Sequence, residues 1–177
     1  MINRIEGEHI VLRKARFSDY ESMLKNIWSD EDIYKWMLFK PTFTKDEAID
    51  RINRTINFQR DHYAYFVALK DTDEPIGFCG IKEYDTNKYE ECGICISKRY
   101  QGNGYGKEVV SLLLVLAFNK LNGDTFRYGY FIDNIKSKSV SDYFGFKYDH
   151  REELIREWDN KKFIVELCSL KKEEYVK

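Results

Sequence analysis

The chain has very little proline, no long apolar run and almost no excess charge. Only Pro41 and Pro75 occur in 177 residues, and no Pro/Gly-rich linker divides the sequence. We therefore predict a single domain over residues 1–177 that ends in a polar tail at 171–177. The longest apolar run, Leu112 to Phe118, is far too short to span a bilayer, so we expect no membrane partner.

The charge balance and the N-terminus exclude two further classes. The net charge is −1 and there is no basic run, so we expect no nucleic-acid partner. Residues 1–6 turn polar at once and lack the charged-then-apolar segment of a secretory signal, which predicts a cytoplasmic location.

The four cysteines, Cys79, Cys92, Cys95 and Cys168, do not follow a metal-binding pattern. Cys92 and Cys95 stand three apart on a predicted strand, where their side chains point to opposite faces. The sequence has no second C-x-x-C, and its three histidines are far apart. We predict no metal site and four buried, reduced thiols.

The order of the predicted elements indicates an α+β fold with one strand–helix–strand crossover in its middle, which should be parallel. Two capping boxes, Ser18-x-x-Glu21 and Thr44-x-x-Glu47, predict the starts of the first two helices. Strands are predicted at 8–14, 63–70, 76–84, 89–96, 125–132, 146–157 and 162–170, and later helices at 109–121 and 135–144.

Three glycines at every second position, Gly102, Gly104 and Gly106, separate a predicted strand from the most apolar predicted helix. Such spacing lets backbone N–H groups point into one small volume without side chains in the way. The start of a helix adds its own unpaired amides and the positive end of its dipole. This pattern predicts a site for a phosphate or a pyrophosphate.

Two well-known phosphate loops do not fit this spacing. A P-loop requires Ser or Thr directly after its lysine, whereas Glu108 follows Lys107. A dinucleotide loop, Gly-x-Gly-x-x-Gly, would require glycine at Lys107 or Val109, so both possible registers fail. A nicotinamide-dependent oxidoreductase is therefore disfavoured.

The remaining pattern, Gln101-x-x-Gly104-x-Gly106, resembles the pyrophosphate loop of the GCN5-related N-acetyltransferases, the GNAT superfamily. Gly7–Arg13 resembles the first strand of that family. The motif Asn134-x-x-Ser137, followed by Gly145-Phe146, resembles the branch that acetylates ribosomal-protein N-termini and, more loosely, spermidine. The resemblance implies a mixed, mostly antiparallel sheet of six to seven strands, with one central parallel β-α-β crossover and about four flanking helices.

The resemblance also implies acetyl-CoA as co-substrate, with its pantetheine pairing along the strand before the loop. The residues implied to contact it are Ile94, Cys95, Ile96, Gln101, Gly102, Asn103, Gly104, Tyr105, Gly106, Lys107, Asn134 and Ser137. The backbone N–H of Cys95 or Ile96 would polarise the thioester carbonyl.

Direct acetyl transfer to a primary amine, either a protein N-terminus or a small molecule such as a polyamine, requires a base and an acid. Glu91 is the favoured base, with Glu83 or water as the alternatives. Many GNAT enzymes carry a tyrosine seven residues after the asparagine, but this chain has Ser141 there. Ser137 is therefore the candidate acid, and a catalytically silent acyl-CoA-binding module is the alternative function.

The sequence says least about which amine accepts the acetyl group. Trp28, Tyr34 and Trp36 lie where the resembled family places a loop over the substrate, although packing between helices also fits them. The acidic run Asp30–Asp32 is consistent either with attraction of a polyamine or with a helix cap. The identity of the amine and the formation of a homodimer stay open.

Overall fold

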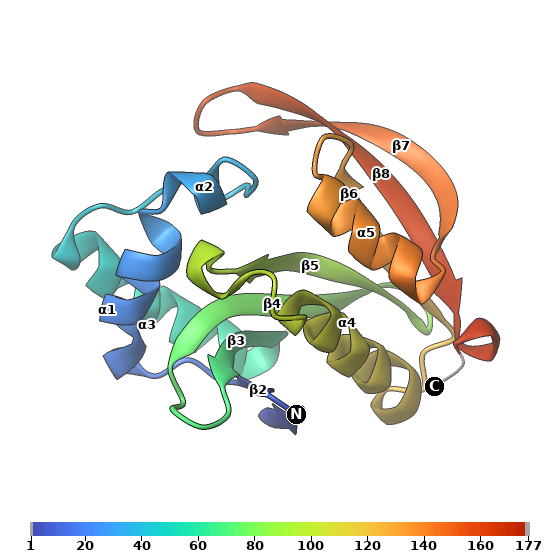
Figure 1. Ribbon diagram of the computed structural model, residues 1–177, viewed down its shortest axis with the longest axis horizontal. Coiled ribbons are helices and arrows are strands. Elements are labelled where there is room, and N and C mark those ends of the chain that lie inside the picture. The colour runs from blue at the N-terminus through green and yellow to red at the C-terminus, as the bar shows by residue number, and fades with distance from the viewer. Residues whose placement is uncertain (1, 176–177) are drawn as a thin grey trace. The chain divides into compact units, whose positions relative to one another are not determined.

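The computed structural model describes residues 2–175, which belong to two structural units. The first unit consists of the chain up to Ile81 together with Cys92–Leu113, and the second of Lys82–Glu91 and the chain from Leu114 onward. Three elements run through both units: β4 (Pro75–Asp85), β5 (Lys88–Ile96) and α4 (Tyr105–Val115) (Figure 1).

The strands are hydrogen-bonded in the order β1-β2-β3-β4-β5-β6-β8-β7. β5 and β6 pair in parallel at Lys88–Glu90 and Thr125–Arg127, whereas β1–β2, β2–β3, β3–β4, β6–β8 and β7–β8 pair antiparallel. The remaining strands are β1 (Arg4–Glu6), β2 (Ile10–Arg13), β3 (Tyr63–Leu69), β6 (Thr125–Phe131), β7 (Lys147–Arg156) and β8 (Lys161–Lys171). The α+β class and the parallel crossover are confirmed, and the sheet has one or two strands more than predicted.

The additional strand, β1, precedes the first predicted strand, 8–14, of which Ile10–Arg13 form β2. Glu8 and His9 belong to a turn, because the Gly7 amide donates to the Ile10 carbonyl at 2.9 Å and folds β1 back onto β2. A Cβ on Gly7 would lie 2.2 Å from Oε1 of Glu108, so a larger residue would displace that side chain.

Three helices belong to the first unit: α1 (Tyr20–Met23), α2 (Glu31–Tyr34) and α3 (Lys45–Asp61). The capping box of α3 is confirmed, since the Glu47 amide donates to Thr44 Oγ1 at 3.3 Å and the Thr44 amide donates to the Glu47 carboxylate at 3.1 Å. α2 was not predicted. It is one of five α-helices where about four were expected.

The predicted capping box of the first helix was wrong. Ser18 makes no capping hydrogen bond within residues 2–175, and the Asp19 carboxylate instead accepts from the Arg16 amide at 2.7 Å and closes the turn before α1. A 3-10 turn at Phe17–Asp19 precedes α1, and a π turn at Leu24–Trp28 continues it, with Ser29 as its C-cap.

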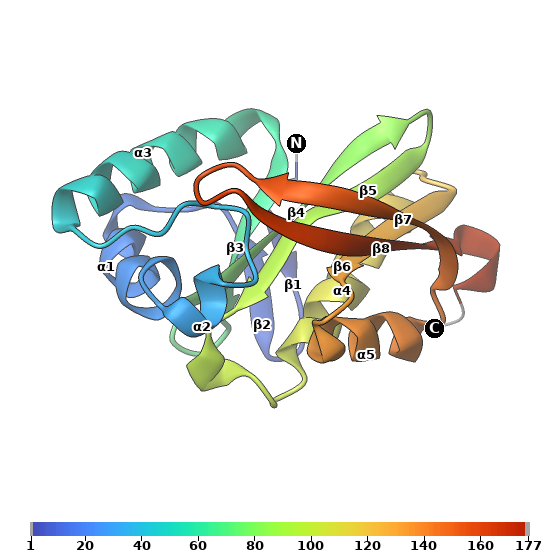
Figure 2. The same ribbon diagram turned by 90° about the horizontal axis from the view of Figure 1, so that it is seen from above.

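Residues from all three helices form one side of the hydrophobic core of the first unit. α1 packs beside α3 (Figure 2). The core combines residues of the helical segments with residues of β3 and β5, namely Met23, Ile27, Trp28, Ile33, Ala48, Ile52, Phe66 and Cys95.

The second unit contains β6, the β7–β8 hairpin and α5 (Ile135–Phe144), whose bounds match the prediction. α5 packs on β6 (Figure 1). It ends at Gly145, whose φ of +74° gives the left-handed cap that favours glycine. α4 enters this unit and is continued by a second π turn, Leu116–Lys120.

The prediction of four buried thiols was wrong for one of them. Cys79, Cys95 and Cys168 are buried thiols outside any disulfide, but Cys92, on β5, is exposed. Within residues 2–175 no group of three or more His, Cys, Asp or Glu side chains is placed to hold a metal ion. No helix in the same range is long and apolar enough to cross a membrane.

A buried ion pair fixes the entry to α1 in the first unit. The Arg13 guanidinium binds both carboxylate oxygens of Asp19, at 2.8 and 2.9 Å, and its Nε donates to Asp73 at 2.8 Å. Arg13 and Asp19 are only 3% and 4% exposed. Since both charges are desolvated, each depends on its partner.

We predict that Arg13→Met destabilises the protein by about 3–5 kcal/mol, because it leaves the Asp19 carboxylate buried without a cation. Urea unfolding followed by circular dichroism measures the loss. Arg16→Met is the matched control: it contacts the same Asp73 with a side chain 57% exposed, so it should cost less than about 1 kcal/mol. Equal losses for the two variants would contradict a special role for the buried pair.

Candidate functional site

The loop that precedes α4 presents a run of backbone amides without acceptors. The N–H groups of the five residues 102–106 donate to no carbonyl or side chain within residues 2–175, whereas those of Lys107 and Glu108 bond the Gly104 carbonyl at 3.0 and 3.1 Å. Gly102, Asn103 and Gly104 are exposed. Five adjacent unpaired donors at the positive end of a helix form a site for an anion.

Two of the three loop glycines are required by backbone conformation. Gly102 and Gly104 have φ values of +89° and +83°, which strain any residue with a Cβ. Gly106 lies in the first turn of α4 at negative φ, so the backbone there tolerates other residues. A Cβ at any of the three would meet nothing within 4 Å, which leaves the space above the amides open.

Two side chains of this loop fix its backbone by hydrogen bonds to nearby carbonyl groups. Gln101 donates through Nε2 to the Ile96 carbonyl at 2.9 Å and thereby ties the loop to the end of β5. Asn103 donates through Nδ2 to the Tyr100 carbonyl at 3.1 Å. The glutamine of the motif therefore positions the loop and leaves its amides free.

The strand before the loop is irregular at Gly93. Its φ of +111° lies in the left-handed region, so the pleat of β5 changes direction just before Ile94. One residue of β4 approaches this part closely, because a Cβ on Gly77 would lie 2.0 Å from the Cys95 carbonyl oxygen. Cys95 and Ile96 are buried, and burial raises the pKa of the Cys95 thiol, so this sulfur stays protonated.

In the second unit, Glu91 lies over β6. Its Oε1 would be 3.5 Å from a Cβ built on Gly129, so the carboxylate sits above the position where β6 has no side chain. The other predicted base, Glu83, accepts from the Asn87 amide at 2.9 Å and holds the turn between β4 and β5. The structure separates the two candidates by role: one faces β6 and the other closes a turn.

A tyrosine of β6 meets the predicted serine. The hydroxyl of Tyr128 and that of Ser137 lie 2.7 Å apart. Tyr128 is 4% exposed. Burial raises its pKa, the hydrogen bond with Ser137 offsets part of that rise, and the Glu91 carboxylate raises the pKa further. The phenol is therefore a neutral O–H donor well beyond neutral pH.

Asn134 begins α5 and keeps part of its amide available. Its Oδ1 accepts from the Ser137 amide at 3.2 Å, as the helix-cap interpretation requires. Its Nδ2 donates to no residue within 2–175. Ser141, in contrast, is buried and faces Cys168 of β8, which it hydrogen-bonds.

The predicted acceptor residues divide into core and surface. Trp28 is 2% exposed and packs in the core beneath the Arg51 guanidinium, whose Cζ lies 4.7 Å from the ring centroid. Tyr34 and Trp36 are half-buried in and after α2. These aromatic residues share one unit with residues 94–107, and the carboxylate, serine and asparagine candidates share the other.

Sequence reasoning missed two residues of this arrangement. Gly93 had a visible signal, since a glycine inside a predicted strand often marks an irregular backbone. Tyr128 had no such signal in the sequence, because its contact with Ser137 depends on how α5 packs on β6 and not on any local spacing.

The family described as acetyltransferase (GNAT) domain matches residues 9–147 of the chain. A curated relative, the uncharacterized N-acetyltransferase p20 of Bacillus licheniformis, is 28% identical over 174 residues, covering 95% of this chain and 96% of the relative.

Solved structures share the fold. A GNAT-family acetyltransferase from Bacillus anthracis matches with a TM-score of 0.81 and 19% identity, over 96% of this chain and 99% of that one. The ribosomal-protein-S5-alanine acetyltransferase from Vibrio fischeri matches with a TM-score of 0.75 and 18% identity, over 99% and 100% of the two chains.

Proposed function

The chain belongs to the acetyltransferase (GNAT) domain family, and on that premise we propose that it transfers the acetyl group of acetyl-CoA to a primary amine. One observation carries the proposal: the unpaired amides of residues 102–106 at the start of α4. Five donors in one exposed loop match the oxygen atoms of a pyrophosphate, and no metal is needed to bind it.

The strand before this loop is the proposed place of the pantetheine and the thioester. Its amide groups would bond to Ile94, Cys95 and Ile96 as an added strand does. The irregular backbone at Gly93 supports this assignment, because it changes the direction of the peptide groups that follow. A backbone N–H of Cys95 or Ile96 would then donate to the carbonyl oxygen as negative charge develops on it.

In the proposed reaction the amine nitrogen attacks the thioester carbon and loses one proton to Glu91. The carbon–nitrogen bond forms, the carbon–sulfur bond breaks, and the departing thiolate takes a proton from Ser137. Water then returns a proton to Ser137 and accepts the one held by Glu91, so that the net change is one proton moved from nitrogen to sulfur. The Tyr128 and Ser137 hydroxyls share a hydrogen bond in which either can donate. With Tyr128 as the donor, the serine proton would be free to point to the sulfur. The pair fills the role that a tyrosine at the position of Ser141 would have.

Asn134 is our further proposed contact with acetyl-CoA, through its available Nδ2. Tyr34 and Trp36 remain the proposed aromatic contacts of the acceptor, and Trp28 acts only by supporting Arg51. The acceptor is a protein N-terminus or a small amine. The ribosomal-protein acetyltransferase among the structural neighbours agrees with the first class, although the likeness extends to the fold alone.

The test of the function is thiol release from acetyl-CoA with spermidine, with peptides bearing free Ser, Ala or Met N-termini, and with an aminoglycoside. Release with any amine supports acetyl transfer. Binding of acetyl-CoA without release from any amine would favour the catalytically silent module. Absence of binding would remove the proposal.

We predict that Gly106→Glu lowers acetyl-CoA affinity at least about ten-fold, because its carboxylate would face the phosphate. Gly106 is a better test than Gly104, whose positive φ would add backbone strain. Gly106→Ala is the matched control and should bind normally, since its Cβ meets open space. Calorimetry measures both affinities. An unchanged acetyl-CoA affinity in Gly106→Glu would contradict the assignment of residues 102–106 as the pyrophosphate site.

We predict that Glu91→Gln lowers kcat about 100-fold with near-normal acetyl-CoA affinity, because the amine loses its base. Glu83→Gln is the matched control, since Glu83 holds a turn, and should keep most of the turnover. Steady-state kinetics decide between them. The reverse result would move the base to Glu83, and full activity in both would assign the proton to water.

We predict that Tyr128→Phe lowers kcat about ten-fold, a modest loss because a thiolate is already a good leaving group. Ser137→Ala should cost a similar amount, and the double variant no more than the worse single one, since the two hydroxyls act as a unit. Tyr148→Phe, an exposed tyrosine of β7, is the control. Additive losses would show that the pair does not act together.

A further inference from the structure

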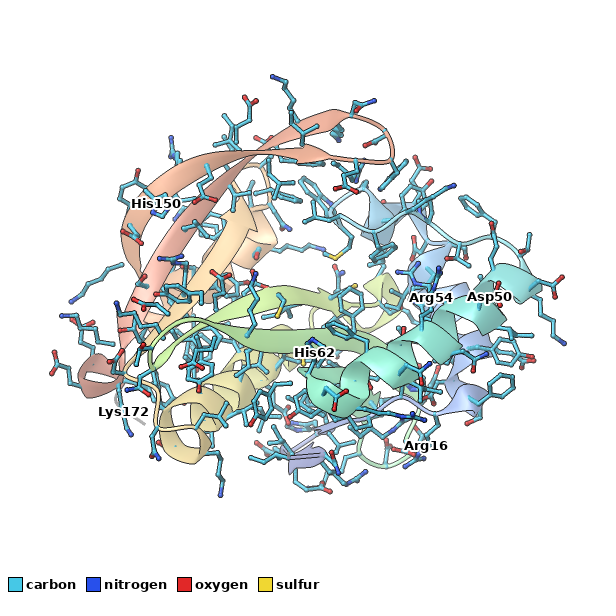
Figure 3. The ribbon with its side chains drawn as sticks, turned by 180° about the vertical axis from the view of Figure 1, so that it is seen from behind. Arg16, Asp50, Arg54, His62, His150 and Lys172 are labelled. Atoms are coloured by element: carbon cyan, nitrogen blue, oxygen red, sulfur yellow. The ribbon has the colours of Figure 1, made fainter. Side chains whose placement is uncertain are left out.

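The first unit contains a cavity of about 610 Å³ beside α3. Its walls come from α3 and from the segment 39–42 that precedes it. Arg51, Arg54 and Phe58 line it from the helix, and Phe39 and Thr42 from the segment. Asp50 and Arg54, both labelled in Figure 3, stand on the same helix.

A desolvated cation forms part of this cavity. The Arg51 guanidinium lies over two rings, 4.3 Å from the centroid of Phe39 and 4.7 Å from that of Trp28. It donates to the Lys40 carbonyl at 3.2 Å and to Thr42 Oγ1 at 3.0 Å. Burial, followed by repulsion from Arg54, lowers the pKa of Arg51 to about 10, so the group is still charged at neutral pH.

No carboxylate compensates the two arginines. Within residues 2–175 neither Arg51 nor Arg54 forms an ion pair. Glu47 lines the same cavity, but its carboxylate caps α3 and accepts from the amides of Phe43 and Thr44. Asp50 also lines the cavity, but it is exposed and forms no ion pair with Arg51 or Arg54. The half-buried Arg51 guanidinium therefore has no anionic partner within residues 2–175, and a bound anion would offset its partial desolvation.

Two of the three acidic residues at positions 30–32 already have partners in the same unit. Asp32 binds Lys35 at 2.5 Å and also binds Lys98, and these bonds lower the pKa of Asp32 to about 2. Asp30 caps α2 by accepting from the Asp32 amide at 2.9 Å. Asp30 and Asp32 are therefore already engaged and contribute little to the attraction of a polyamine.

The cavity borders the irregular part of β5. The Phe39 ring stacks edge-on to Phe78, with centroids 6.0 Å apart. The Phe78 ring in turn lies 3.4 Å from the Cβ position of Gly93. Cys95 belongs to the same core as Trp28 and interacts electrostatically with Arg51.

We propose that this cavity binds the carboxylate of the acceptor through Arg51 and Arg54. The substrate class is then a molecule that carries both a primary amine and a carboxylate, such as an amino acid or a short peptide. This inference rests on the proposed function, because the amine can be acetylated only if the thioester lies along β5. Phe39 and Phe58 would cover the apolar part of such a molecule.

The kinetic test compares acceptors that differ only in charge: glycylglycine with glycylglycinamide, and β-alanine and 6-aminohexanoate with their amides. The expected kcat/KM is at least about ten-fold higher for the best carboxylate than for its amide. Arg54→Gln should reduce that ratio below about three-fold. Arg60→Gln removes the same charge from an exposed position on the same helix and should leave the ratio unchanged.

The binding test titrates glycylglycine and glycylglycinamide into the protein by calorimetry in the presence of CoA, which permits no transfer. We expect tighter binding of the carboxylate, lost in Arg54→Gln and weakened by added salt. Arg51→Lys keeps the charge but not the planar fork, and should give an intermediate loss. Arg54 is exposed, so its variant folds even if that of Arg51 does not.

The two hypotheses fail differently. Equal binding of carboxylate and amide, or binding of neither, overturns the inference. Thiol release with spermidine or with amides at the same rate as with carboxylates also overturns it but supports acetyl transfer. Carboxylate binding that depends on Arg54, without thiol release from any acceptor, supports the cavity assignment and overturns the proposed function.

Discussion

A single carboxylate holds the start of α4 in place. Glu108 accepts from the amides of His9 and Ile10, at 2.9 and 3.2 Å, and so fastens the first turn of the helix to the beginning of β2. Gly7 leaves room for this side chain. Because the carboxylate is occupied by β2, it does not fill the unpaired amides of residues 102–106. The anion site therefore depends on a contact made almost a hundred residues away in sequence.

Local patterns predicted most of the fold. The capping box at Thr44, the glycine after Phe144 and the alternating strands each reflect hydrogen bonds or backbone angles within a few residues, so sequence alone determines them. The glycine spacing predicted the loop for the same reason. The start of α1 was mispredicted because Asp19 has a stronger partner, Arg13, that no local pattern reveals.

The parts of the site that escaped prediction are side-chain contacts that no motif or spacing in the sequence indicates. Tyr128 reaches Ser137 only because α5 packs on β6, and Glu83 is occupied by a turn whose geometry the sequence does not display. The sequence likewise does not reveal that Arg51 lacks a carboxylate partner. An arginine on a helix normally finds a carboxylate, and only the packing of Trp28 and Phe39 around its guanidinium shows that this one does not.

The two π turns, Leu24–Trp28 and Leu116–Lys120, each contain one residue more than an α-helical path would need. An extra residue rotates everything after it by about 100° around the helix axis. The wider π turn takes up that rotation, so a homologue with one residue fewer in either segment would keep a continuous helix and present the same faces beyond it. In evolutionary terms these turns are places where a one-residue insertion or deletion is absorbed, and an alignment of this chain with its relatives needs separate anchors on either side of each.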